Sequence, residues 1–356
     1  MTHQLDLFAS LQPEMPAEAP TVPTPAPTPV PAAFTATETT TPVRPQQPRR
    51  PDSFLKDPSE RAFQVGEAVA NAWNKQHGGT HIEVPIGLVA ALALIRQKDA
   101  NGPDLGRQIL AQDDRQLITM YREIWSVHWI HRPDLIDRAR ILHEWLNDEP
   151  EPDRHRMYVV RMVTKAALER GLFDITGHAD PYVRSQADVL SPTLTLLRSL
   201  GAQQGLGEYH TPPPVTDTIA EAVIGSVVAE LQVGRLKGIK PNEHVHDPAS
   251  GTGGMLRSAA QLLRREGLEP ADYRWSMVDI GLIAAACAAV NCLVWGLGPN
   301  VTVACDDSLA NPNAVEDAIK HARAVIEHRD QILGTARMVA AVRQAEQLLN
   351  QVAAAA

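Results

Sequence analysis

The sequence predicts an α/β protein in which a helical N-terminal region precedes a short parallel sheet and a C-terminal helix follows it. Apolar residues recur every three or four positions, the spacing of a helix face, between 59 and 198. Three short strand candidates then alternate with helical segments between 244 and 305. Strand, helix, strand, helix, strand is the order of a parallel sheet with right-handed crossover connections.

Residues 1–52 are predicted to be a disordered tail. Twelve of the 28 prolines lie within the first 51 positions, and a segment of this composition buries too little apolar surface to offset its chain entropy. An extended linker of this kind lets a peptide at its N-terminal end bind a partner at a distance from the folded domain. That beginning, residues 4–8, is free of proline.

Residues 53–200 are predicted to form a helical domain. Pro133 suits the first turn of a helix, and Gly171 suits the position after the end of one. The expected helices span 59–76, 86–97, 114–130, 133–147 and 155–170.

Residues 201–313 are predicted to form the α/β module, and residues 314–356 a C-terminal helical segment with Gly334 as its one interruption. The module begins with a loop rich in glycine and proline and a helix at 215–232. The strands expected after it are His244–Asp247, Trp275–Asp279 and Val301–Cys305, with helices at 254–266 and 282–295.

Composition limits the classes of function. The formal net charge is -9, so no global positive field holds nucleic acid, and contact with DNA must be weak or arranged by a partner. No run reaches the roughly 18 apolar residues that suggest a membrane span. The three cysteines show neither disulfide nor zinc spacing, and the N-terminus has no apolar signal region, which predicts a cytoplasmic protein.

The segment from Asp247 to Gly254, Asp-Pro-Ala-Ser-Gly-Thr-Gly-Gly, carries the strongest chemical signal. It follows a predicted strand and precedes a predicted helix, where glycines let the backbone approach a ligand and the helix N-terminus offers free N–H groups. Asp279, which ends the second strand, is placed to accept hydrogen bonds from ribose hydroxyls. The pattern predicts a nucleoside cofactor, although a glycine-rich turn without a ligand is the alternative.

The acid that opens this loop bears on which cofactor binds. A dinucleotide site needs Gly-x-Gly-x-x-Gly, and the Asp247 carboxylate would repel a pyrophosphate. S-adenosylmethionine carries a positively charged sulfonium and ammonium and tolerates a carboxylate there.

Residues 247–256 resemble the Asp-Pro-Ala-Cys-Gly-Thr-Gly-Gly motif of adenine-N6 DNA methyltransferases, most closely that of the modification subunit of type I restriction systems, with Ser250 in place of Cys. Residues 207–212, Gly-Glu-Tyr-His-Thr-Pro, resemble the segment that precedes this motif in the family. Residues 289–296 and 307–309 resemble its Ala-x-x-Asn-x-x-x-x-Gly helix and its Asp-Thr-Leu.

The resemblance, which covers about residues 205–310, implies a truncated Rossmann-like, S-adenosylmethionine-dependent methyltransferase module. It also implies a complementing methyltransferase or specificity subunit as a partner. Asp247 and the glycine turn would contact the methionine moiety, Asp279 the ribose and Asp307 the adenine amino group. The cofactor-binding residues implied are Tyr209, Thr211, Pro212, Asp247, Ala249, Gly251, Gly253, Gly254, Asp279 and Asp307.

The sequence lacks the Asn/Asp-Pro-Pro-Tyr/Phe tetrapeptide by which the family polarises the adenine amino group and stacks on the flipped base. Asn311 is the one approximation, without the second proline or the aromatic residue. Two hypotheses therefore remain open. The chain is an adenine-N6 DNA methyltransferase that a partner completes, or it is an inactive accessory or binding module.

Residues 4–8 (Gln4, Leu5, Asp6, Leu7 and Phe8) resemble the pentapeptide by which many bacterial proteins bind the replicative sliding clamp. A short apolar peptide on a flexible linker suits such docking, since the linker raises the effective concentration of the tethered domain. The alternative is an apolar N-terminus formed by chance. Clamp docking would bring the chain to DNA, and to the nucleoid, without a basic surface.

Metal binding is not expected. His244 and His246 alternate on the first predicted strand and share one face, but strand histidines of this kind are usually structural.

Overall fold

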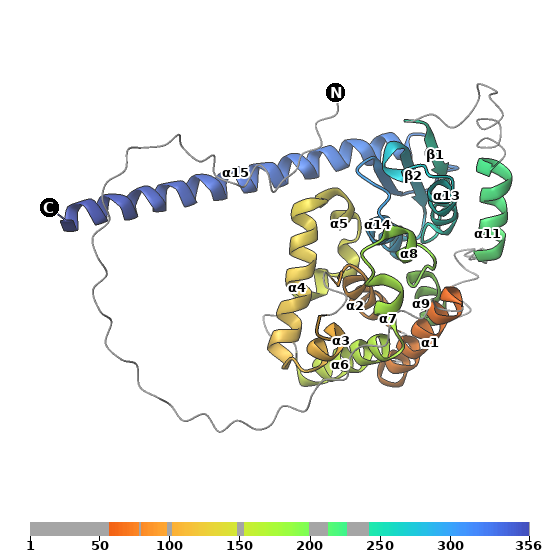
Figure 1. Cartoon of the computed structure of the whole chain (residues 1–356), viewed down its shortest axis with the longest axis horizontal. Helices are drawn as coiled ribbons and strands as arrows, with labels where there is room; N and C mark the ends of the chain where they lie inside the picture. Colours follow the sequence, from red (N-terminus) through yellow and green to blue (C-terminus); the bar gives the residue numbers. More distant parts are fainter. Residues whose placement is uncertain are drawn as a thin grey trace. The chain divides into compact units, whose positions relative to one another are not determined.

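The computed structural model describes residues 57–77, 80–97, 102–147, 153–198, 213–225 and 242–355. The predicted tail at 1–52 lies outside these ranges. Residues Pro51–Ala356 form one compact unit. In it, a small three-stranded parallel sheet packs beside a larger set of helices (Figure 1), which confirms the coarse prediction of a helix-rich α/β fold.

The helical region is built around α2 (Glu83–Ala93), whose residues from Val84 to Ala93 are all buried. A helix that is apolar on every side suits the centre of a core. The other helices of this region lie around it, and the longer ones bury one apolar face. They are α1 (Pro58–His77), α3 (Leu105–Leu110), α4 (Asp114–His131), α5 (Pro133–Arg138), α6 (Arg154–Glu169), α7 (Leu172–Thr176), α8 (Pro181–Arg184) and α9 (Leu190–Leu197).

The helix expected at 133–147 ends early. Pro133 does stand in the first turn of α5, as predicted, but the helix stops at Arg138, and two 3-10 turns follow, Arg140–Leu142 and Glu144–Asn147. The backbone bends here because Leu142 packs against α2. A Cβ added at Gly87 would meet the Leu142 carbonyl oxygen at 1.8 Å, so only glycine allows this contact.

The sheet has the order β1–β2–β3, with β1 at His244–Asp247, β2 at Arg274–Asp279 and β3 at Val301–Cys305. The predicted strands are confirmed, β2 beginning one residue early. Both pairs are parallel, and Asp247 aligns with Met277 while Asp279 aligns with Cys305. The carboxyl ends of all three strands therefore share one edge of the sheet. Helix α13 (Gly254–Arg265) connects β1 to β2, and α14 (Leu282–Trp295) connects β2 to β3.

The two faces of the sheet are covered by different helices. Trp275 and Met277 of β2 lie in the large core that contains α13, α14 and the helical region. Val278 and Ala304 point the other way and pack against Ala314 and Ala318 at the start of α15 (Ala314–Ala355). The alternation of strand side chains thus separates two cores.

The C-terminal helix α15 runs without a break through Gly334, although the sequence suggested an interruption there. One glycine in a helix costs only about 1 kcal/mol relative to alanine, too little to end it. Helix α11 (Pro213–Ala220), which continues as a π-helical turn over Glu221–Gly225, packs against α13. No helix among the described residues is long and apolar enough to cross a membrane.

Candidate functional site

The loop between β1 and α13 passes through two left-handed backbone positions. Gly251 has a φ of 55° and Gly253 a φ of 94°, values that residues with a side chain rarely adopt. The Ser250 amide donates to the Val278 carbonyl at 2.9 Å, and the Gly253 amide donates to the Ser250 carbonyl at 2.8 Å. These bonds fold the loop back onto the end of β2.

Gly253 also permits close packing. A Cβ at this position would lie 3.2 Å from the Met277 sulfur and 3.2 Å from the Trp295 ring. Both the backbone angle and the close neighbours therefore require glycine at position 253. The sequence pattern indicated a glycine turn here but not these contacts.

The Asp279 carboxylate fixes the loop to β2. Its Oδ2 accepts the Gly251 amide at 2.7 Å, and its Oδ1 accepts the Gly281 amide at 2.8 Å. Each carboxylate oxygen can accept a second hydrogen bond, so the side chain keeps acceptor capacity for a ligand.

Asp247 is buried at the end of β1, with 4% of its surface exposed. Its Oδ1 accepts the Ala249 amide at 3.1 Å, and no arginine or lysine of the described ranges pairs with it. Burial raises the pKa of this carboxyl above its usual value, the Ala249 hydrogen bond opposes the rise, and the nearby Asp279 charge adds to it. A cation bound beside Asp247 would offset both the cost of burying the ionised carboxylate and its repulsion from Asp279.

Two features of the loop suit a ligand. The Ser250 hydroxyl is buried and has no hydrogen-bond partner among the described residues, and a buried hydroxyl without a partner is costly. A Cβ added at Gly254 would meet no atom of the described residues within 4 Å, so this part of the chain leaves space beside the first residue of α13. The Asp247 and Asp279 carboxylates are hydrogen-bond acceptors, which suits a polar ligand with a cationic group.

The turn after β3 lies at the same edge of the sheet. The Asp306 amide donates to the Asp279 carbonyl at 3.1 Å. Asp307 Oδ1 accepts the Leu309 amide at 2.9 Å and the Ala310 amide at 3.3 Å. Asp307 thus shapes its own turn with Oδ1.

Asn311 is committed to the same turn. Its Nδ2 donates to Asp306 Oδ2 at 2.7 Å, and its Oδ1 accepts the Asn313 amide at 2.9 Å. Within the part of the chain described here, these local bonds hold the side chain, and no strand precedes it in the way the family's tetrapeptide requires.

The predicted cofactor residues that the structure describes converge. Asp247, Ala249, Gly251, Gly253 and Gly254 lie in the loop, and Asp279 and Asp307 lie at the ends of the next two strands. Tyr209, Thr211 and Pro212 lie outside the described residues, as do residues 4–8.

Sequence reasoning missed two features of the site. Asp188, between α8 and α9, accepts a hydrogen bond from the Thr252 hydroxyl in the middle of the loop at 2.6 Å. Ile280, directly after Asp279, is 60% exposed. The exposure of Ile280 can be predicted only once the end of β2 at Asp279 is known. No local sequence pattern indicates that Asp188 pairs with Thr252.

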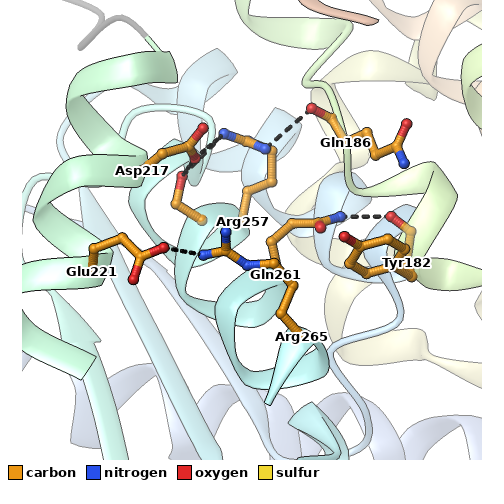
Figure 2. Close-up of a pocket in the computed structure, with 8 residues that line it drawn as sticks. Tyr182, Gln186, Asp217, Glu221, Arg257, Gln261 and Arg265 are labelled. Atoms are coloured by element: carbon orange, nitrogen blue, oxygen red, sulfur yellow. Dashed lines mark hydrogen bonds and ion pairs between the residues drawn. The ribbon is translucent and has the colours of Figure 1, made fainter. Parts of the chain in front are cut away.

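A separate polar hollow of about 190 Å³ lies between α8, α11 and α13 (Figure 2). Arg257 crosses it, buried, and donates to the Ser185 and Gln186 carbonyls and to Asp217. None of the residues from Asp247 to Gly254 lines it, so the hollow is distinct from the loop site. The lining residues are Tyr182, Gln186, Asp217, Glu221, Arg257, Ser258, Gln261 and Arg265.

The charged groups of this hollow neutralise one another. Arg257 pairs with Asp217 at 2.8 Å, and Arg265 pairs with Glu221. The ion pairs that line the hollow therefore join α13 to α11 and to the π-helical turn that continues it, as the dashed lines in Figure 2 show.

His244 and His246 both contact the Ser276 hydroxyl, each at 2.7 Å. Among the residues that the structure describes, no group of three histidine, cysteine or acidic side chains is arranged for a metal ion.

Comparison with known proteins adds three findings. The profile of the N-6 DNA methylase family matches residues 195–327. None of the curated proteins matches the sequence. A solved structure, the DrdV–DNA complex determined by cryoEM, matches 73% of this chain at 14% identity and a TM-score of 0.34; the matched part is 26% of that chain, so this protein spans about a quarter of its length. The resemblance to the adenine-N6 DNA methyltransferases is thus confirmed over residues 195–327, which include the loop, all three strands and the turn after β3.

Proposed function

We propose that this chain binds S-adenosylmethionine at the carboxyl edge of β1–β3, as the cofactor half of an adenine-N6 DNA methyltransferase with a Rossmann-like fold. The observation that carries the proposal is the loop at 250–254, which the Asp279 carboxylate fixes beside the buried Asp247 carboxylate. Ligands of open parallel α/β sheets bind outside the carboxyl ends of the strands.

Each group at this edge suits one part of the cofactor. Asp247 offers a negative charge to the cationic methionine moiety. Asp279 has acceptor capacity left for ribose hydroxyls, and Ile280 offers an exposed apolar surface for the adenine ring. Asp307, whose Oδ1 shapes its turn, has Oδ2 available for an adenine amino group.

The sequence lacks the tetrapeptide that forms the acceptor half of the site in the family it resembles. When bound, S-adenosylmethionine supplies an activated methyl group on a cationic sulfur. Transfer to adenine N6 also needs groups that polarise the amine and stack on the flipped base, since flipping costs a few kcal/mol. We therefore propose that methyl transfer requires a partner that carries the Asn/Asp-Pro-Pro-aromatic tetrapeptide.

Calorimetric titration with S-adenosylmethionine tests the binding proposal. Wild-type chain is expected to bind, and Asp247→Asn is expected to weaken binding by more than about tenfold, because it removes a buried charge that faces the cation. Asp217→Asn, which changes a carboxylate in the separate hollow, is the matched control and should bind as wild type does. No heat at millimolar ligand with the wild-type chain would overturn the proposal.

Transfer of a labelled methyl group to DNA separates the two hypotheses about activity. The methyltransferase hypothesis predicts label in adenine only when a partner subunit is present, and loss of label in Asp247→Ala. If no partner of this type gives label while the cofactor still binds, the chain is an accessory or binding module.

We also propose that residues 4–8 recruit the chain to DNA by docking on the bacterial sliding clamp. The support is the pentapeptide Gln-Leu-Asp-Leu-Phe and the absence of a net positive charge. Capture of the full chain by immobilised clamp should be lost when Leu7→Ala and Phe8→Ala are combined. Equal capture of both proteins would remove this part of the proposal.

A further inference from the structure

Asp188 joins three parts of the protein through one carboxylate. Its Oδ2 accepts the Thr252 hydroxyl at 2.6 Å. Its Oδ1 accepts the Asn291 side-chain amide of α14 at 3.0 Å and the Leu190 and Ser191 amides at the start of α9 at 2.9 and 3.1 Å. The helical region, the loop and α14 therefore meet at this side chain.

The contact with Thr252 acts at the most constrained point of the loop. Thr252 stands between Gly251 and Gly253, both left-handed, and only 2% of its surface is exposed. Its two glycine neighbours have no side chains, so Thr252 supplies the side-chain anchor at this point.

Asn291 completes the arrangement. The same Nδ2 that donates to Asp188 also donates to the Thr252 carbonyl at 2.9 Å. Asp188 thus holds the Thr252 side chain directly and orients the amide that holds its backbone. The ring of hydrogen bonds through Asp188, Asn291 and Thr252, which takes part with both its hydroxyl and its backbone carbonyl, is more rigid than its separate bonds.

We propose that Asp188 is a positioning residue of the cofactor site. It acts through Thr252 and Asn291. By these contacts it holds the backbone of the loop from Gly251 to Gly254 in one conformation before a ligand binds. This inference rests on the proposed function for its effect on S-adenosylmethionine, but its effect on the loop is measurable without any ligand. Preorganisation of this kind lowers the ordering cost of binding.

The first experiment follows amide hydrogen exchange in the ligand-free full chain. Asp188→Ala and Thr252→Val should each speed exchange across the loop from Ala249 to Gly253, while amides of α2 keep their protection. Thr252→Ser keeps the hydroxyl and should restore slow exchange. Thr335→Val removes an exposed threonine hydroxyl on α15 and is the matched control, with no change expected in the loop.

The second experiment measures the dissociation constant of S-adenosylmethionine in a double-mutant cycle. Asp188→Ala and Thr252→Val should each weaken binding by about tenfold, as second-layer substitutions commonly do. The double variant should be no weaker than Asp188→Ala alone, because the bond lost in Thr252→Val is among those that Asp188→Ala already removes. Thr252→Ser should bind within about twofold of wild type.

The two measurements fail in different ways. Unchanged loop exchange in Asp188→Ala, or losses of affinity that multiply in the double variant, would overturn the role of Asp188. If Asp188→Ala does not fold, Thr252→Val and Thr252→Ser decide the question alone. A wild-type chain that binds no S-adenosylmethionine would overturn the proposed function, while the exchange data would still report whether Asp188 sets the loop.

Discussion

The Gly251 amide donates a hydrogen bond of 2.7 Å to the Asp279 carboxylate, and through this bond the end of β2 fixes the loop that follows β1. The two residues are 28 positions apart. Because β1 and β2 are parallel neighbours, Asp279 and the glycine turn lie at the same edge of the sheet. The hydrogen bond between them fixes the position of both.

Asp279→Asn tests this bond through stability. An amide side chain has one oxygen, so it cannot accept from both Gly251 and Gly281 without a change of geometry. We expect the free energy of unfolding to fall by about 1 to 3 kcal/mol. Urea denaturation measures it, with Asp272→Asn at an exposed position as control. Equal midpoints for Asp279→Asn and wild type would contradict the assignment.

Gly253 and Gly254 form a second matched pair. Gly253→Ala strains a left-handed backbone and crowds Met277 and Trp295, so it should cost about 2 kcal/mol or more. Gly254→Ala meets open space at a helix start and should leave thermal stability unchanged or raised. The same Gly254→Ala should weaken S-adenosylmethionine binding if the ligand fills that space. Unimpaired binding by Gly254→Ala would place the ligand elsewhere.

Binding of the cationic cofactor should depend on pH through Asp247. Burial, with the Asp279 charge, raises the pKa of this carboxyl in the free protein. The group therefore takes up its proton at a higher pH than an ordinary aspartate, and affinity should fall as pH decreases through that raised value. A bound cation favours the ionised form, so protons are released on binding in this window. Calorimetry in buffers of different ionisation enthalpy detects that release, and Asp247→Asn should abolish it.

Thiol alkylation reports on the same edge of the sheet. Cys287 and Cys292 are buried, and burial raises the pKa of both thiols, that of Cys292 to about 12. Cys305 at the end of β3 is half-buried, and burial raises its pKa as well. We expect slow labelling of one thiol, absent in Cys305→Ser, in the native protein and of three thiols after denaturation. Mass spectrometry of the labelled chain measures it, and rapid labelling of three native thiols would contradict the packing of α14.

Arg257 should matter for stability far more than the carboxylate it pairs with. Arg257→Met leaves the Ser185 and Gln186 carbonyls without their donor in a buried place, at an expected cost of about 3 kcal/mol or more. Asp217 is 55% exposed, so Asp217→Asn should cost less than about 1 kcal/mol. Chemical denaturation compares the two variants. A larger loss of unfolding free energy in Asp217→Asn than in Arg257→Met would contradict this assignment.

The helices and strands follow closely from local sequence. The three strands were predicted as short segments that alternate with helical segments, and the parallel order follows from the helices between them. The helix expected at 133–147 was wrong in its second half, since the bend at Arg138 depends on a contact between Leu142 and Gly87 that no local pattern encodes.

For the candidate site, the sequence determined the glycine turn, the acid Asp247 that opens it and the acid at the end of β2, because each is read within one strand and its adjoining turn. Only the tertiary structure decided what holds the turn in place. Asp188 lies 64 positions from Thr252 and 103 from Asn291, and a hydrogen bond between residues so far apart exists only after the helical region has packed against the sheet. Local sequence sets backbone geometry over a few residues, whereas the partners of a side chain depend on how distant elements come together.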